Sequence, residues 1–173
     1  MDNHLYIIRG IPGSGKSTFA RKLIAKGMAD VYYEADMFFK RNGTYQYDRS
    51  KLSQAHEWCQ NQVMRALRQG KNAIVSNTFT TIPEILPYVR FCRTNHIPFQ
   101  VVRLTTNFGS IHGVPVDAID RMKDQFEDWR GEIRIPQSPT GAQKISENTK
   151  ITLTISQLKR LVEESCAYRS SRF

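Results

Sequence analysis

The sequence contains no long apolar run and few cysteines. Its longest apolar run, around Leu5 to Ile8, is far shorter than the ~20 residues that a membrane-spanning helix needs. The three cysteines, Cys59, Cys92 and Cys166, lie far apart without CxxC spacing, which argues against a disulfide framework or a zinc site. The first residues, MDNH, lack the basic and apolar regions of a secretory signal. We therefore expect a cytoplasmic protein with free thiols and no membrane segment.

Acidic residues are scarce relative to basic ones. The 173-residue chain has 16 Asp plus Glu against 25 Lys plus Arg, which gives a formal net charge of +9. This balance favours a polyanionic partner, most commonly nucleic acid, although a solvated basic surface has the same composition. The basic residues form no long block of the kind found in disordered nucleic-acid-binding tails. Charge thus supports a phosphate-rich substrate without identifying it.

Short apolar runs alternate with helical patterns, which is typical of βαβ units around a parallel sheet. Strands are expected at 5–8, 31–33, 73–75 and 99–104, and helices at 18–26, 52–67, from Pro83 onward and at 115–129. We predict an α/β domain over 1–130, with a doubly wound, mainly parallel sheet flanked by helices. The composition at 134–141 indicates a linker, and a strand at 151–154 with a helix to Glu164 completes a C-terminal extension over 131–173, packed on the same domain.

A glycine-rich loop stands between the first strand and the first helix. Residues 10–18, GIPGSGKST, match GxxxxGK[ST] in the strand–loop–helix context that this motif requires. Glycines let backbone N–H groups wrap a phosphate, and the following helix N-terminus favours negative charge. Lys16 is expected to reach the β- and γ-phosphates of ATP, and the Ser17 hydroxyl to ligate Mg²⁺. The residues expected to hold the nucleotide are Gly10, Pro12, Gly13, Ser14, Gly15, Lys16, Ser17 and Thr18.

The residues beyond this loop favour a kinase over other P-loop proteins. The sequence has no NKxD-type motif, with which switch GTPases read the base. The third strand ends Val75-Ser76-Asn77, where a motor ATPase would carry an acidic residue. A kinase instead needs a carboxylate near the tip of a neighbouring strand, and Asp36, shortly after 31–33, meets that requirement. The structural alternative is that Asp36 caps the following short helix, and the two roles are compatible.

Other polar and aromatic residues are candidates for contacts to the acceptor. Asn77 and Thr78 end a strand on the side where doubly wound sheets bind ligands, so they either position an acceptor or a metal-bound water, or form a turn. His112 either contacts phosphate or structures the loop at 105–113. Tyr45 and Tyr47, in a Gly-containing loop after Asp36, either stack on an acceptor base or pack a half-buried hairpin.

In order and spacing these motifs resemble those of phage-type polynucleotide 5′-kinases, and more closely those of a P-loop kinase-like AAA family common in phage and bacterial genomes. The similarity runs from about residue 5 to residue 129. The resemblance to polynucleotide kinases lies in 10–21, 34–36, 77–78 and 114–117. The segments that match the AAA family are 36–39 (DMFF), 43–48 (GTYQYD), 55–59 (AHEWC), 77–80 (NTFT) and 112–122 (HGVPVDAIDRM).

The resemblance implies a P-loop NTPase fold and ATP- and Mg²⁺-dependent transfer of the γ-phosphoryl group to a hydroxyl. It implies that Asp36 is the general base, and that Lys16, Ser17 and Thr18 contact triphosphate and metal. Where polynucleotide kinases carry an arginine three residues beyond the base, this chain has Phe39, and 105–113 lacks the arginines of their lid. A cation normally stabilises the transferring group, and the candidates are Arg121 and Arg103.

We therefore predict a kinase for the 5′-hydroxyl of a polynucleotide, with Asp36, Lys16 and Arg121 as catalytic residues. The residues expected to face the acceptor are Asp36, Asn77, Thr78 and His112. Two alternatives remain open at this point. One is a kinase for a nucleoside, nucleotide or drug hydroxyl, which would need Asp36 but show no salt-sensitive binding to oligonucleotides. The other is a regulatory module that binds nucleotide with little turnover.

Overall fold

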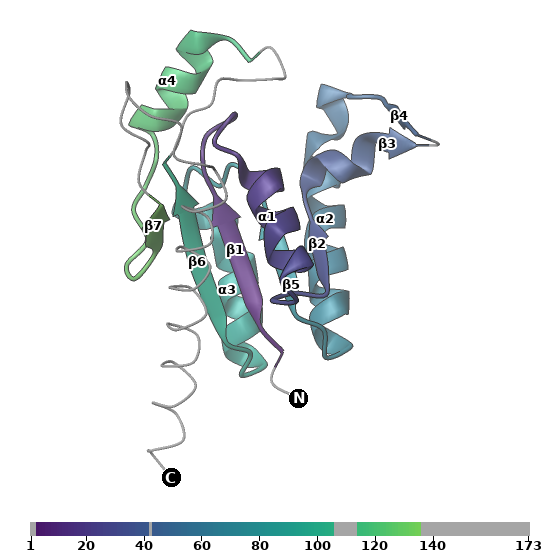
Figure 1. Cartoon of the computed structure of the whole chain (residues 1–173). Coiled ribbons are helices and arrows are strands. Elements are labelled where there is room, and N and C mark those ends of the chain that lie inside the picture. Colours follow the sequence, from purple (N-terminus) through teal and green to yellow (C-terminus); the bar gives the residue numbers. More distant parts are fainter. Residues whose placement is uncertain (1–2, 42, 106–113, 136–173) are drawn as a thin grey trace.

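The computed structural model describes residues 3–41, 43–105 and 114–135, which form a parallel sheet with helices on both faces (Figure 1). The strand order in the sheet is β2–β5–β1–β6–β7. Its strands are β1 (Leu5–Arg9), β2 (Val31–Tyr33), β5 (Ala73–Ser76), β6 (Phe99–Leu104) and β7 (Ile133–Ile135). The helices are α1 (Lys16–Ala25), α2 (Leu52–Arg68), α3 (Ile82–Thr94) and α4 (Val116–Asp124), with the 3₁₀ helices η1 (Ala35–Phe39) and η2 (Arg49–Lys51). A small hairpin pairs β3 (Lys40–Arg41) with β4 (Thr44–Tyr45).

Strand β1 runs through the middle of the sheet, and all of its residues are buried. Leu5 and Ile7 belong to the core between the sheet and helices α2 and α3, whereas Tyr6 and Ile8 belong to the core beneath α1. Successive side chains of a strand point to opposite faces, so a strand segment covered by helices on both sides favours apolar residues on both faces. This is why the run at 5–8 shows no alternation of polar and apolar residues.

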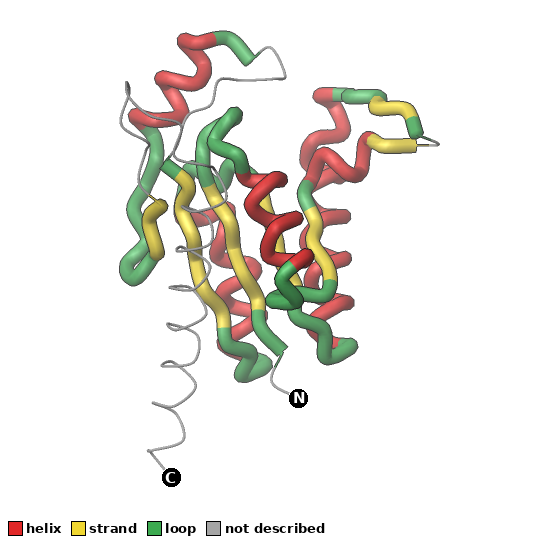
Figure 2. Tube along the Cα trace, in the orientation of Figure 1, coloured by secondary structure: helices red, strands yellow, loops and turns green. Residues whose placement is uncertain are grey.

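The sheet topology places several loops at one edge. From β1 the chain crosses to β2, returns to insert β5 between them, and continues to β6 on the other side of β1. In such sheets ligands bind beyond the carboxyl ends of the strands, where the strand order reverses. Figure 2 shows the loop after β1 at the upper edge of the sheet, with η1 and the hairpin on the upper right.

Most of the expected elements are present, including the parallel α/β sheet and the four expected strands in the described part of the chain. Two expectations were wrong. The helix expected at 115–129 ends at Asp124, because Phe126 leaves the helix and packs against the guanidinium groups of Arg9 and Arg103. The first two residues of the expected linker, 134 and 135, instead belong to β7, which pairs with β6. The strand expected at 151–154 and its following helix lie outside the described residues.

No helix within the described ranges is long and apolar enough to cross a membrane.

Candidate active site

The loop between β1 and α1 has the backbone shape that a phosphate cradle requires. Gly13 and Gly15 have φ angles of 79° and 84°, a left-handed conformation that residues with a side chain rarely adopt. Gly10 is needed for a different reason, namely space. A Cβ atom at this position would lie 2.6 Å from Ser14 Oγ and 2.8 Å from the carbonyl oxygen of Leu104 at the end of β6. The glycine spacing of the motif is therefore fixed by backbone conformation and by close packing against the sheet.

Lys16, the first residue of α1, reaches back across this loop. Its Nζ atom donates hydrogen bonds to the carbonyl oxygens of Gly10 (2.8 Å) and Ile11 (2.9 Å). Burial lowers the pKa of Lys16 to about 8, and the negative charges of Glu34 and Asp36 oppose this shift. The ammonium group is thus held at the mouth of the cradle, between the loop carbonyls and two carboxylates.

The Ser17 hydroxyl donates a hydrogen bond to Glu34 Oε2 at 2.7 Å. Glu34 directly follows β2 and lies next to the P-loop because the sheet brings the carboxyl ends of its parallel strands to one edge. A hydroxyl and a carboxylate are oxygen ligands of the kind that Mg²⁺ prefers. Sequence reasoning missed Glu34 as a site residue, although its place directly after a strand, two residues before Asp36, was a usable signal.

Asp36 lies on η1, with an exposed side chain. Its negative charge raises the pKa of Lys16, against the larger opposite effect of burial. Partial burial, followed by the neighbouring Asp36 charge, raises the pKa of Tyr45. The N-cap of η1 is Glu34, without a side-chain capping bond, so the alternative that Asp36 caps this helix was wrong.

Asn77 and Thr78, after β5, join the loops of the site to one another. The Asn77 side chain is buried, and its Oδ1 accepts a hydrogen bond from the backbone N–H of Ala35 (2.9 Å). Its Nδ2 lies 3.8 Å from the sulfur of Cys59 on α2. The Thr78 carbonyl oxygen accepts a hydrogen bond from the backbone N–H of Gly10 (3.1 Å). These contacts anchor the segment that carries Glu34 and Asp36, and the first residue of the P-loop, to the end of β5.

The two arginines expected to supply a cation are both engaged elsewhere. Arg121 lies on the exposed surface of α4, where its Nη1 is 3.0 Å from Asp117 Oδ2 one turn earlier. Arg103 Nη1 is 2.7 Å from Asp128 Oδ1, and its guanidinium lies 4.0 Å from the centroid of the Phe126 ring. His112 lies outside the described residues, so its predicted contact stays a prediction.

A buried ion pair behind the P-loop was not evident from the sequence. Arg9, the last residue of β1, is fully buried, and its Nη1 lies 3.2 Å from Glu132 Oε2, just before β7. Its Nε and Nη2 atoms also donate to the carbonyl oxygen of Phe79, at 2.9 and 2.6 Å. The segment between α4 and β7 is therefore fastened to the strand that leads into the phosphate loop.

The buried Lys16 makes nucleotide affinity dependent on pH. With a pKa of about 8 in the free protein, Lys16 is largely protonated below that pH and loses its proton above it. A bound triphosphate favours the ammonium form, so binding above pH 8 must take up a proton. We expect the affinity for ATP to be flat below pH 8 and to fall above it, by up to about tenfold per pH unit.

Isothermal titration calorimetry from about pH 7 to about 9.5, in two buffers of different ionisation enthalpy, measures both the affinity and the proton uptake. Lys16→Met should remove this pH dependence, and Lys26→Met, at the exposed end of α1, should retain it. Proton uptake that is unchanged in Lys16→Met would contradict the assignment.

A parallel sheet with a P-loop at its switch point, and with two carboxylates beside the loop lysine, defines the chain as a P-loop kinase-like nucleotide-binding protein. It belongs to the AAA domain family AAA_33, whose model matches residues 5–111. NEDD4-binding protein 2 of Homo sapiens is 33% identical over 135 residues, 71% of this chain and 8% of that protein. The uncharacterized protein PM0531 of Pasteurella multocida (strain Pm70) is 30% identical over 131 residues, 68% of this chain and 73% of that protein. The chain thus spans only a small part of the human relative.

Solved structures of P-loop kinases share the fold. A gluconokinase from Sinorhizobium meliloti 1021 has a TM-score of 0.63 at 14% identity and covers 99% of both chains. Kti12 of Chaetomium thermophilum, in complex with ADP-AlF3, has a TM-score of 0.61 at 13% identity over 90% of this chain and 97% of that one. The APS kinase CysC of Mycobacterium tuberculosis, in complex with AMPPNP and APS, has a TM-score of 0.58 at 15% identity over 91% and 98%. At these identities the likeness concerns the fold alone.

Proposed function

We propose that the protein is an ATP- and Mg²⁺-dependent phosphotransferase that acts on the 5′-hydroxyl of a polynucleotide. The observation that carries the phosphotransferase activity is the exposed Asp36 carboxylate, whose charge acts on Lys16 and which follows two residues after Glu34, the partner of Ser17. A general base, a cation for the transferring phosphoryl group and oxygen ligands for a metal are the parts that phosphoryl transfer to a hydroxyl requires.

Asp36, Lys16 and the phosphate loop have distinct roles in the proposed reaction. Asp36 accepts the proton of the acceptor hydroxyl, whose oxygen forms a bond to the γ-phosphorus while the bond from that phosphorus to the β,γ-bridging oxygen breaks. ADP leaves with the electron pair of the broken bond. Lys16 and the loop N–H groups bind the phosphate oxygens, and Lys16 must exchange the carbonyls of Gly10 and Ile11 for those oxygens.

Ser17 and Glu34 fit a magnesium site. Their oxygens are 2.7 Å apart, and no group of three or more His, Cys, Asp or Glu side chains in the described residues could hold a metal ion alone. Magnesium in kinases is commonly held by one or two protein oxygens together with substrate phosphates and waters. When bound, the ion neutralises charge that develops on the phosphoryl oxygens. Ser17 is the proposed ligand, and Glu34 either orients it or binds a coordinated water.

Charge and motif resemblance support a polynucleotide as the acceptor. The net charge of +9 favours a polyanion, and residues 10–21, 34–36, 77–78 and 114–117 resemble polynucleotide 5′-kinases. The two alternatives are a small-molecule acceptor and a regulatory role that needs only nucleotide binding.

The test is transfer of labelled γ-phosphate from ATP with Mg²⁺ to a 5′-hydroxyl oligonucleotide, beside an oligonucleotide of the same sequence with a 5′-phosphate and a panel of nucleosides and sugars. We expect label only on the 5′-hydroxyl oligonucleotide. Label on a nucleoside or sugar instead would replace the polynucleotide with a small-molecule acceptor. If ATP binds but no acceptor is labelled, the regulatory role is favoured.

A further inference from the structure

The hairpin after η1 presents an exposed aromatic surface that the phosphate chemistry does not use. Tyr45 is 48% exposed and Tyr47 is 53% exposed. Their rings are nearly parallel, with an interplanar angle of 18° and centroids 6.5 Å apart. Within the described part of the chain, only Leu52 and Val116 are comparably exposed large apolar side chains. Exposed aromatic side chains that lie together commonly mark a binding surface.

Both tyrosine rings pack against the buried side chain of Phe39. Phe39, only 3% exposed, makes edge contacts with both rings, at centroid distances of 6.3 Å from Tyr45 and 5.2 Å from Tyr47. The backbone N–H of Gln46 donates to the Phe39 carbonyl oxygen at 2.9 Å. We call this cluster of Tyr45, Tyr47 and Phe39 the tyrosine platform. Phe39 stands where polynucleotide kinases carry an arginine, so in this chain that position builds the platform.

The tyrosine platform lies next to Asp36, the proposed general base. Asp36 and Phe39 lie on the same short helix η1, and both tyrosine rings pack on Phe39. A molecule whose hydroxyl approaches Asp36 therefore lies within reach of the tyrosine rings. This proximity links the aromatic surface to the acceptor rather than to ATP, whose phosphates belong to the loop after β1.

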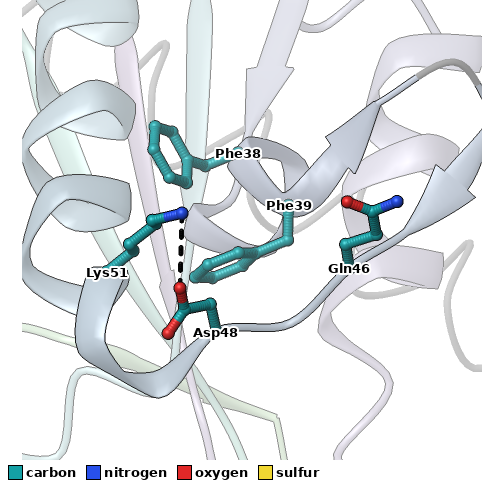
Figure 3. A pocket seen from close by; sticks show the side chains of 5 residues that line it. All are labelled: Phe38, Phe39, Gln46, Asp48 and Lys51. Atoms are coloured by element: carbon teal, nitrogen blue, oxygen red, sulfur yellow. Dashed lines mark ion pairs between the residues drawn. The ribbon is translucent and has the colours of Figure 1, made fainter.

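A cavity of about 60 Å³ lies next to the tyrosine platform. Figure 3 shows Phe38 and Phe39 lining it and the ion pair between Lys51 Nζ and Asp48 Oδ2, 3.3 Å apart, at its side. The exposed faces of Tyr45 and Tyr47 are the aromatic surface that is open to a ligand.

The surrounding sequence is basic. Residues 40–51 contain four basic residues, Lys40, Arg41, Arg49 and Lys51, and a single acidic residue, Asp48. Positive charge next to stacking side chains is the combination with which proteins hold single-stranded nucleic acid. A neutral sugar or a small organic alcohol carries no charge that the basic residues could attract.

We propose that the tyrosine platform stacks the first base of a single-stranded nucleic-acid 5′ end and thereby selects acceptors whose terminal nucleotide is unpaired. This inference rests on the proposed function, because it assigns the acceptor of the same site. Stacking does not read the base edges, so all four bases are accepted. The terminal base of a blunt duplex is paired and stacked on its neighbour, and must be freed at a cost before it can bind.

The experiment compares three 5′-hydroxyl acceptors of one sequence: a single strand, a blunt duplex, and a single strand whose first nucleotide lacks its base. For the wild-type protein we expect KM to be lowest for the intact single strand and at least about fivefold higher for the other two. The same three acceptors are made in DNA and in RNA, and the comparison shows which nucleic acid is phosphorylated. A higher KM after removal of the first base, in either DNA or RNA, supports the platform. Equal KM values for the intact and the baseless single strand in both series would overturn it.

Variants of Tyr47 separate stacking from a purely structural role. Tyr47→Ala should raise KM for the intact single strand to the value for the baseless one and leave kcat within about twofold, whereas Tyr47→Phe should retain wild-type KM because it keeps the ring. Val116→Ala, an exposed site on α4, is the matched control, and thermal unfolding verifies that each variant is folded. Tyr47→Ala with an unchanged KM would contradict the platform.

Equilibrium binding of the same oligonucleotides, labelled at the 3′ end and followed by fluorescence anisotropy, keeps the two proposals apart. Base-dependent binding that is lost in Tyr47→Ala, without any phosphate transfer, would support the platform and overturn the proposed kinase activity. Transfer without base dependence would overturn the platform alone. Absence of both binding and transfer would overturn both.

Discussion

Asp36→Asn is expected to lower kcat for phosphoryl transfer by about 10²–10⁴-fold and to leave ATP affinity nearly unchanged. The amide has almost the shape of the carboxylate but cannot take the proton of the acceptor hydroxyl. Asp36 lies close enough to Lys16 for its charge to act on the lysine, yet its side chain is exposed and open to an acceptor. The measurement is the rate of γ-phosphate transfer under saturating ATP, with ATP binding determined separately by calorimetry.

Asp124→Asn is the matched control, because Asp124 is an exposed carboxylate at the end of α4. It should transfer phosphate at the wild-type rate. If Asp36→Asn retains more than about a tenth of the wild-type kcat, Asp36 is not the general base. The nearby Glu34, through Glu34→Gln, would then be the next residue to test.

Glu132→Met is expected to lower the free energy of unfolding by about 3–5 kcal/mol, the usual cost of leaving one partner of a buried ion pair uncompensated. The side chains of Arg9 and Glu132 are 0% and 2% exposed, and their charged atoms are 3.2 Å apart. For a chain of this size the midpoint of thermal unfolding should fall by roughly 6–20 °C. Urea denaturation followed by circular dichroism measures the free energy directly.

Asp128→Asn is the contrasting variant. Asp128 also pairs with arginines, at 2.7 Å from both Arg103 and Arg134, but its side chain is 66% exposed. Exposed pairs are screened by water and salt, so stability should change little. In the double variant Arg9→Met/Glu132→Met no charge is left buried and unpaired, so it should be more stable than Glu132→Met alone. Equal loss in Glu132→Met and Asp128→Asn would show that burial of the pair is not what matters.

Local patterns were sufficient to predict much of the fold. The uninterrupted apolar run of β1 reflects burial on both faces of the sheet. The helical spacing of apolar residues in α2 reflects burial of one helix face. Each pattern is contained in a single segment of the sequence. The end of α4 was not predictable in this way, because the helical pattern continues to Phe126 while the ring is drawn to Arg9 and Arg103. For the same reason β7 was not distinguished from a linker: it is a strand because β6 offers it an unpaired edge.

The candidate site likewise combines residues that short motifs predict with contacts that depend on the fold. The P-loop was evident because backbone conformation and phosphate contact are both encoded in nine consecutive residues. Asp36 was predicted because a kinase base was expected after a neighbouring strand, and its role stays a prediction. Glu34 was missed because its contact with Ser17 depends on how β2 and the P-loop lie in the sheet. The two predicted cations, Arg121 and Arg103, illustrate the converse, since their spacing in the sequence did not show that acidic neighbours engage them.

The phosphate loop, the class of fold and the charge that favours a polyanion can all be read from the linear sequence. They depend on residue type, on short-range spacing and on composition. The contacts between distant residues are visible only in the folded protein: Asn77 with the backbone of Ala35, 42 residues away, and Arg9 with Glu132, 123 residues away. Such contacts are set by strand order and by the packing of whole elements, because atoms far apart along the chain become neighbours only when the sheet has formed.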